Sequence, residues 1–350
     1  MQKGVKAMKK IAKCDLSKLF AAIAEGSELY LPVKVAGQTN FAPYTADAEV
    51  DVDTLKTVKS AKDIFFPQSE NLYTCITDEE KKISITPETL RNTDFVVYGM
   101  RGCDAKGMEV LDKVFLSEPV DSFYAARRAH GTVVAAACGE PEETCFCKVF
   151  GVDCSEPAAD VVTWTVGDTV YWKAYTEKGE ALTEKLSGVL ADADEKAVED
   201  EKAKIKAIVE KLPYSDLSLD KFGAGKTMEL FDSPIWEDLY KPCLACGTCT
   251  FVCPTCQCYD IKDYNTGKGV QRFRCWDSCM YSDFTMMAHG NNRTSQMQRF
   301  RQRFMHKLVY FPDNNDGMYS CVGCGRCLER CPASLNIVKV VKAFQEGAGK

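Results

Sequence analysis

Two stretches of the chain carry the same pattern of cysteine and proline, C-x2-C-x2-C-x3-C-P. The first runs from Cys243 to Pro254 and the second from Cys321 to Pro332. Three thiolates spaced in this way can wrap a short loop around one corner of an iron–sulfur cubane, with backbone amides turned toward the sulfides. The fourth cysteine lies past a turn and binds the other cluster. The repeated pattern therefore predicts two 4Fe-4S clusters.

The predicted ligand sets are crossed between the two motifs. One cluster is assigned to Cys243, Cys246, Cys249 and Cys331, and the other to Cys321, Cys324, Cys327 and Cys253. Structural zinc is the alternative, but it usually takes two separated C-x2-C pairs, not a triplet followed by C-P. Four protein thiolates on each cluster leave no open coordination position. We therefore expect one-electron transfer here, with no catalytic residue on this chain.

A second set of cysteines lies in the first half of the sequence. Cys103 follows the strand-like run 95–98, and Cys138, Cys145 and Cys147 follow the run 132–137. Loops at strand ends are where an α/β fold assembles sites from distant parts of the chain. The spacing leaves two interpretations open, a third metal site or buried thiols acting as small apolar side chains. A further group has no assigned role: Cys256, Cys258, Cys275 and Cys279.

Length and composition limit what surrounds these sites. The chain has 350 residues, 19 cysteines, 45% hydrophobic residues and a net charge of -6. Such a length favours two domains, and the acidic balance argues against a nucleic-acid-binding protein. No apolar run approaches the ~20 residues of a membrane span. The basic amino terminus, expected to be a surface helix, lacks the pattern of a signal peptide. We therefore expect a cytoplasmic protein that binds neither nucleic acid nor membrane, with reduced thiols that favour metal binding.

The predicted fold is α+β in two parts. Residues 1–225 are expected to form a mixed α/β domain with a hairpin at 161–175, and an amphipathic helix is expected within 191–212. Residues 226–350 are expected to form an α-helical, ferredoxin-like domain with two clusters and a long insertion between the motifs. That insertion contains a basic helix predicted at 295–308. Its positive charge has two favoured uses: contact with an acidic partner protein, or internal pairing that offsets the negative charge of the clusters.

Several of these motifs together resemble one known family. They are the Cys103, Cys138, Cys145 and Cys147 group, the Cys-Pro-Thr-Cys-x-Cys run at 253–258, Trp276-Asp277-Ser278-Cys279, the His306-Lys307 region and the run at 321–327. From about residue 60 to its end, the chain resembles a family with two kinds of member. These are the iron–sulfur electron-transfer subunit of anaerobic sulfite reductase, and the beta subunit of sulfhydrogenase-type NiFe hydrogenases.

The resemblance implies an electron-transfer subunit with a third 4Fe-4S cluster on Cys103, Cys138, Cys145 and Cys147. It also implies two partners, a flavin- and NAD(P)H-binding subunit, and a catalytic subunit of siroheme or nickel-iron type. The expected function is to relay single electrons between them in an anaerobic oxidoreductase complex of the sulfite reductase kind. The alternatives are the beta subunit of a cytoplasmic NiFe hydrogenase and a free-standing ferredoxin-like carrier.

Overall fold

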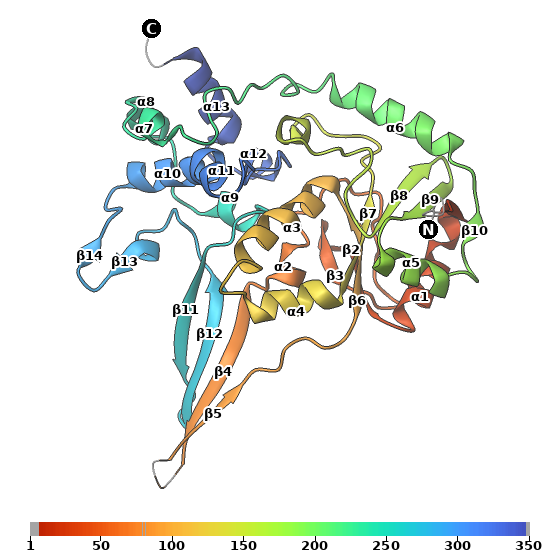
Figure 1. Cartoon of the computed structure of the whole chain (residues 1–350), viewed down its shortest axis with the longest axis horizontal. Coiled ribbons are helices and arrows are strands. Elements are labelled where there is room, and N and C mark those ends of the chain that lie inside the picture. Colours follow the sequence, from red (N-terminus) through yellow and green to blue (C-terminus); the bar gives the residue numbers. More distant parts are fainter. Residues whose placement is uncertain (1–6, 79, 81, 348–350) are drawn as a thin grey trace.

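The computed structural model describes residues 7–78, 80 and 82–347. Its largest element is an eight-stranded mixed sheet, in the strand order β10-β1-β9-β8-β7-β6-β2-β3 (Figure 1). The strands are β1 (Lys9–Ala12), β2 (Glu28–Val35), β3 (Gln38–Pro43), β6 (Phe95–Met100), β7 (Gly131–Ala136), β8 (Val161–Val166), β9 (Thr169–Ala174) and β10 (Ala191–Asp192). Strands β2, β6, β7 and β8 are parallel to one another, so their carboxyl ends meet at one edge. The predicted mixed α/β organisation is confirmed, and β8 and β9 form the predicted hairpin.

Helices cover both faces of this sheet because its central strands are apolar on both sides. On β6, Val96 and Tyr98 pack with α1 (Leu16–Ala24) and the residues around α5 (Glu177–Lys185). The opposite face of the sheet packs with three other helices: α2 (Lys62–Phe65), α3 (Gly102–Phe115) and α4 (Ser122–His130). Cys103 therefore stands in the first turn of α3, directly after a buried parallel strand.

Two local predictions near the ends of this region have different outcomes. The amphipathic helix is present as α6 (Lys196–Val209), whose buried residues include Val198 and Ile205. The amino-terminal helix is wrong for Lys9–Ala12, which form β1 and pair with β9, but a helix follows as α1 from Leu16. Residues 1–6 of that segment lie outside the described part of the chain. Antiparallel pairing with a central hairpin has taken precedence over the helical tendency of a lysine-rich segment.

A second sheet projects from the body of the molecule as an arm (Figure 1). It is antiparallel, in the order β11-β12-β4-β5. Its strands are β4 (Ser69–Thr77), β5 (Ile83–Pro87), β11 (Tyr259–Asn265) and β12 (Gly269–Trp276). The arm joins strands from both sides of the predicted domain boundary at 225/226, and that boundary itself stays a prediction. The β11–β12 hairpin lies within the long insertion between the two cysteine motifs.

The remainder of the chain is mainly short helices around a separate apolar core that includes Trp236, Phe300, Phe304 and Phe344. The predicted basic helix is present as α10, which begins with a capping box at Ser295 and continues into a π-helical turn, His306–Tyr310. The helices are α7 (Thr227–Leu230), α8 (Ile235–Leu239), α9 (Thr248–Phe251), α10 (Gln296–Met305), α11 (Phe311–Asn314), α12 (Arg326–Glu329) and α13 (Ile337–Glu346). The two-residue strands β13 (Met286–Met287) and β14 (Gly290–Asn291) pair with each other. No helix among the described residues has the length and apolarity needed to cross a bilayer.

A buried ion pair ties the second cysteine motif to the large sheet domain. Arg326 in α12 and Asp104 in α3 are both 2% exposed. The guanidinium donates from Nη1 to Oδ1 at 2.5 Å and from Nη2 to Oδ2 at 2.9 Å, and its Nε donates to the Thr57 carbonyl. A bidentate pair of this kind fixes orientation as well as distance. It therefore holds the Cys321–Cys331 segment against the first turn of α3, which carries Cys103.

Replacing Asp104 with alanine is expected to lower the free energy of unfolding by about 3–5 kcal/mol, because Arg326 is left buried and unpaired. Chemical denaturation of anaerobically isolated protein, with iron measured on the same samples, checks this. The matched control is Lys113→Ala, which removes an exposed ion pair to Asp316 and should cost less than about 1 kcal/mol. Equal stability of the two variants would contradict the expectation.

Candidate iron–sulfur cluster sites

One cavity is lined by the first three cysteines of the first motif together with the last of the second. We call it the outer site: Cys243, Cys246, Cys249 and Cys331. Cys246 is exposed, so this cavity lies at the surface. Backbone amides already point at its sulfurs, with Ala245 N–H donating to Cys243 Sγ at 3.4 Å and Leu335 N–H to Cys331 Sγ at 3.2 Å. Amide donors of this kind stabilise anionic sulfur.

A second cavity is lined by the remaining four cysteines of the two motifs. We call it the central site: Cys253, Cys321, Cys324 and Cys327. The structure thus brings the eight motif cysteines together in the crossed grouping that the spacing predicts. Helices α9 and α12, which carry the third cysteine of each motif, are in contact. This packing brings the two motif loops together.

Glycine is required in the loop of each motif. Gly247 and Gly325 precede α9 and α12 with φ of 73° and 78°. A Cβ at Gly247 would stand 2.5 Å from the Tyr281 hydroxyl oxygen, and one at Gly325 would stand 2.5 Å from the Thr144 carbonyl oxygen. A side chain at either position is excluded both by the left-handed backbone and by its neighbours. The Cys-Gly-x-Cys part of each motif is therefore set by geometry as well as by chemistry.

A third cavity lies at the carboxyl ends of β6 and β7, between the two parts of the chain. We call it the inner site. Its lining thiols are Cys103, Cys138, Cys145, Cys147 and Cys154, together with Cys324, which also lines the central site. Sequence reasoning grouped the first four and missed Cys154. The sulfur of Cys154 hydrogen-bonds to those of Cys138 and Cys147, which lowers the pKa of Cys138 and raises that of Cys154. The only signal for Cys154 in the sequence is its position seven residues after Cys147, which matches no common ligand spacing.

The three cavities form a row. The outer and central sites share Arg303 as a lining residue, and the central and inner sites share Cys324. The outer and inner sites have no described lining residue in common. The Phe146 amide donates to the Gly323 carbonyl at 2.9 Å and so joins the loop of the inner site to that of the central site. The central site therefore lies between the other two.

The unassigned cysteines divide into two kinds. Cys256 and Cys279 are buried, and Cys258 is half-buried next to Cys279. Hydrogen bonds link Cys256 to Cys253 and Cys258 to Cys279. Contact with Cys256 lowers the pKa of Cys253 and raises that of Cys256, because the thiol of Cys256 donates to the sulfur of Cys253. Cys275 is different, because it lies on the arm opposite Asp260. These contacts support a structural role for Cys256, Cys258 and Cys279, as thiols packed beside the sites.

Buried cations test whether an anionic group fits these cavities. Arg303 and Lys307 are 4% and 5% exposed. Arg303 Nη2 donates to the Cys249 carbonyl and Lys307 Nζ to Thr255 Oγ1 and the Ser320 carbonyl, while Arg303 Nε has no hydrogen-bond partner among the described residues. Neither cation has a carboxylate within ion-pair distance in that part of the chain. Burial of an unpaired charge is costly, so the residues fit a site that holds negative charge.

The pKa of Lys307 leads to the same conclusion. Burial alone would lower it, but the negative sulfurs of Cys253, Cys256 and Cys321 raise it well above its usual value. No three His, Cys, Asp or Glu side chains in the described ranges converge closely enough for a single metal ion. Ligands of a cubane instead surround a space, as these cysteines do. The geometry therefore favours clusters over the zinc alternative.

Most basic residues of the insertion are used inside the molecule. Arg272 pairs with Asp263 on the arm, and Arg274 is buried against Glu70 and Asp121. Arg301 stacks on Phe231, with the guanidinium 3.6 Å from the ring centroid. Arg303 and Lys307 face the cavities and support the alternative in which the insertion offsets the negative charge of the clusters. Arg272 and Arg274 instead pair with carboxylates.

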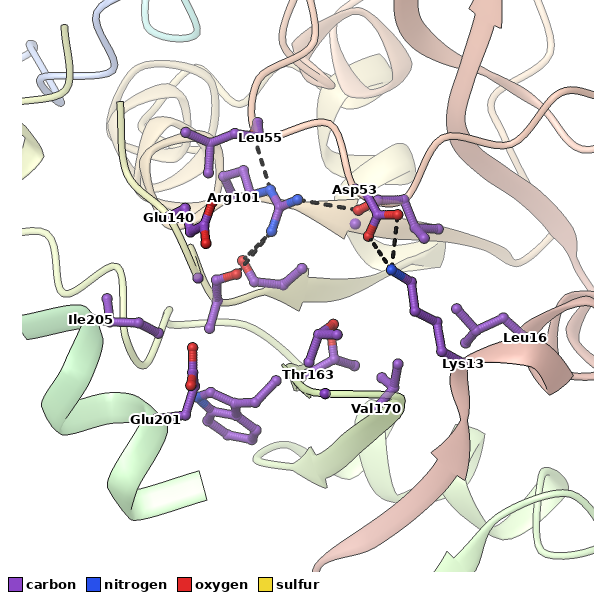
Figure 2. A pocket seen from close by; sticks show the side chains of 18 of the residues that line it. Lys13, Leu16, Asp53, Leu55, Arg101, Glu140, Thr163, Val170, Glu201 and Ile205 are labelled. Atoms are coloured by element: carbon purple, nitrogen blue, oxygen red, sulfur yellow. Dashed lines mark hydrogen bonds and ion pairs between the residues drawn. The ribbon is translucent and has the colours of Figure 1, made fainter. Parts of the chain in front are cut away.

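A larger cavity of about 370 Å³ adjoins the inner site and was not predicted from the sequence (Figure 2). It opens at the carboxyl ends of the parallel strands, where α/β proteins commonly bind ligands, and shares Leu55 and Arg101 with the inner site. Three of its charged groups are engaged within the molecule. Lys13 pairs with Asp53, and Arg101 donates to the carbonyls of Leu55 and Ala137. This arrangement fixes the wall between the two cavities.

Comparison with known proteins places these sites in a family. A model of the 4Fe-4S dicluster domain matches residues 242–335, which span both motifs. The chain is 30% identical over 335 residues to the beta subunit of sulfhydrogenase 2 from Pyrococcus furiosus, covering 94% of this chain and 95% of that protein. The match extends over the sheet domain as well as the cluster motifs. This chain belongs to the family of iron–sulfur electron-transfer subunits that includes the sulfhydrogenase beta subunits.

Proposed function

We propose that this chain is the electron-transfer subunit of a multi-subunit anaerobic oxidoreductase, working between a catalytic subunit and one that binds flavin and NAD(P)H. Clusters bound at the three sites would accept and donate single electrons. The ligands proposed are the eight crossed motif cysteines and, at the inner site, Cys103, Cys138, Cys145 and Cys147. We propose no catalytic residue on this chain and assign it to the cytoplasm.

The observation that carries this proposal is the row of three cysteine-lined cavities. The inner site has lining cysteines at most 9% exposed, whereas the outer site reaches the surface at Cys246. Such a row offers a path through the protein without an open metal position for substrate. The helical, ferredoxin-like character proposed for residues 226–350 agrees with the short helices α9 and α12 that begin within the motifs.

Among possible complexes, we propose a sulfhydrogenase-type one with a nickel-iron catalytic subunit. Full-length similarity to a protein named as a sulfhydrogenase beta subunit favours it over the sulfite reductase-like complex with a siroheme subunit. The arm argues against a free-standing carrier. It exposes Ile83, Ile85 and Tyr264 at 65%, 63% and 63%, and exposed apolar side chains on a projecting sheet are typical of a surface that contacts another protein.

Anaerobic isolation from the native organism tests this assignment. We expect the chain to co-purify with a flavin-containing subunit, and with one that contains nickel, identified by native mass spectrometry and metal analysis. If the co-purifying catalytic subunit contains siroheme and no nickel, the hydrogenase assignment is wrong and the sulfite reductase-like complex is correct. A chain that runs alone would refute the permanent-subunit proposal.

Replacing Cys246 with serine should disturb the spectrum of the outer cluster and block electron delivery to the terminal acceptor. The reason is that the surface site loses one of its four thiolates. Oxidation of NAD(P)H by the flavin subunit with an artificial dye should continue, since that subunit is untouched. Cys14→Ser is the matched control, because Cys14 is exposed and lines none of the three sites. An unchanged cluster spectrum in Cys246→Ser would count against the ligand assignment.

A further inference from the structure

Buried positive charge is distributed unevenly along the row of sites. Arg303 lines both the outer and the central site, whereas Lys307 lines the central site alone. Lys62, 3% exposed, approaches the same region from the sheet domain, donating to the Cys256 carbonyl at 2.8 Å. Its ammonium also lies over the Trp276 ring, 3.6 Å from the centroid. Three buried cations thus converge around the central site.

These three cations have no carboxylate partners within ion-pair distance in the described part of the chain. Arg303 and Lys307 donate to carbonyls and a hydroxyl, and Arg303 Nη1 stands 3.8 Å from Cys256 Sγ. Arg326 also lies beside Cys324, but Asp104 neutralises it. The positive charge at the central site is therefore balanced by sulfur alone.

The inner site has cations of a different kind. Lys56 lines it but forms ion pairs with both Glu142 and Glu329. Arg101 lines it too and donates to the carbonyls of Leu55 and Ala137, with no carboxylate within ion-pair distance among the described residues. The inner site thus keeps one cation without a carboxylate partner, against the two that line the central site. The outer site has Arg303 as its one lining cation among the described residues, and it is open to solvent at Cys246.

We infer that Arg303 and Lys307 make the central site the most easily reduced of the three, so that electrons rest there between the two ends of the row. This rests on the proposed function. A cluster with four thiolates is negative, and each one-electron reduction adds a further negative charge. Nearby fixed cations stabilise the reduced form more than the oxidised form, and burial leaves that attraction poorly screened. Cluster potential is known to respond to local charge and exposure.

The test is a potentiometric titration of the anaerobic full-length chain with dithionite as the one-electron donor, followed by electron paramagnetic resonance. Cys321→Ser, a change confined to the central site, identifies that site's signal. In the unmodified chain the central signal is expected to appear first as the potential is lowered. If the central signal appears last, this result from the unmodified chain alone overturns the inference, and no cation variant is needed.

The effects of Lys307 and Arg303 can be measured separately, because Lys307 lines the central site alone and Arg303 lines both the central and the outer site. Lys307→Gln should lower the equilibrium constant for reduction at the central site at least tenfold, which is 59 mV for a one-electron couple, with the outer signal unmoved. Arg303→Gln should lower it at both sites, and Arg303→Lys should retain most of the effect. The matched control is Arg301→Gln on the same helix, whose side chain stacks on Phe231 instead.

The outcomes distinguish this inference from the proposed function. Absence of iron and of any cluster signal in the unmodified chain would refute the proposed function itself. Intact clusters with an unmoved central potential in both Lys307→Gln and Arg303→Gln would refute only the inference. If Arg303→Gln loses its iron, Lys307→Gln and the order of reduction in the unmodified chain still decide.

Discussion

Replacing Cys253 with serine is expected to damage the cluster of the second motif and to spare that of its own motif. Cys253 ends the first motif, but it lines the central site with Cys321, Cys324 and Cys327. Replacing Cys331 should do the reverse, since Cys331 lines the outer site with Cys243, Cys246 and Cys249. Each variant should lose about four irons per chain and one of the two spectroscopic signals that belong to the motif clusters. Iron analysis and electron paramagnetic resonance on anaerobic protein measure both.

The crossing itself is decided by comparing variants. Cys253→Ser and Cys321→Ser should both lose the central signal and keep the outer one. Cys331→Ser and Cys243→Ser should both lose the outer signal and keep the central one. Cys275→Ser is the control, because that thiol lies on the arm strand β12 and its loss should leave both signals intact. If Cys253→Ser instead matched Cys243→Ser, each motif would hold its own cluster and the crossed assignment would be wrong.

The motif sites were predictable because their information is local. Spacing within residues 243–254 and 321–332 determines which sulfurs share a loop, and glycine at 247 and 325 provides the left-handed turn. The hairpin at 161–175 and the helices within 191–212 and 295–308 were predictable for the same reason, since periodicity and turn residues act over a few positions. The crossed grouping of the two motifs was predictable from the spacing that paired clusters require. In the structure, the contact between α9 and α12 joins the motifs.

Features that depend on distant pairing were not predictable. The arm forms because β12 pairs with β4, almost two hundred positions earlier in the sequence. Nothing in either strand specifies that partner. Lys62 approaches the central site only because the arm and the body bring residue 62 beside Trp276. Cys154 was missed because membership of the inner site depends on the loop after β7 folding back onto Cys138.

The inner site carries the second large expectation, a third cluster that brings the total to about twelve irons per chain. Replacing Cys145 with serine should lower the total to about eight, with the outer and central signals retained. Cys145 lines only the inner site, and burial raises the pKa of its thiol to about 12 while Lys56 opposes that effect. Such a sulfur is poorly suited to standing free as a thiolate, but a metal-bound sulfur is deprotonated by the metal. A content of about eight irons in the unmodified chain would refute the prediction of an inner cluster.

Besides Cys324, which is assigned to the central site, five thiols line the inner site. A cubane takes four, so one of the five has another role. We expect it to be Cys154, because its sulfur contacts those of both Cys138 and Cys147 and these contacts raise its pKa. Cys154→Ala should therefore keep about twelve irons while shifting the inner signal, since a ligand sulfur loses its donor. Cys147→Ala should lose about four irons. The opposite result, iron loss in Cys154→Ala and retention in Cys147→Ala, would exchange the two roles and leave the third cluster in place with a different fourth ligand.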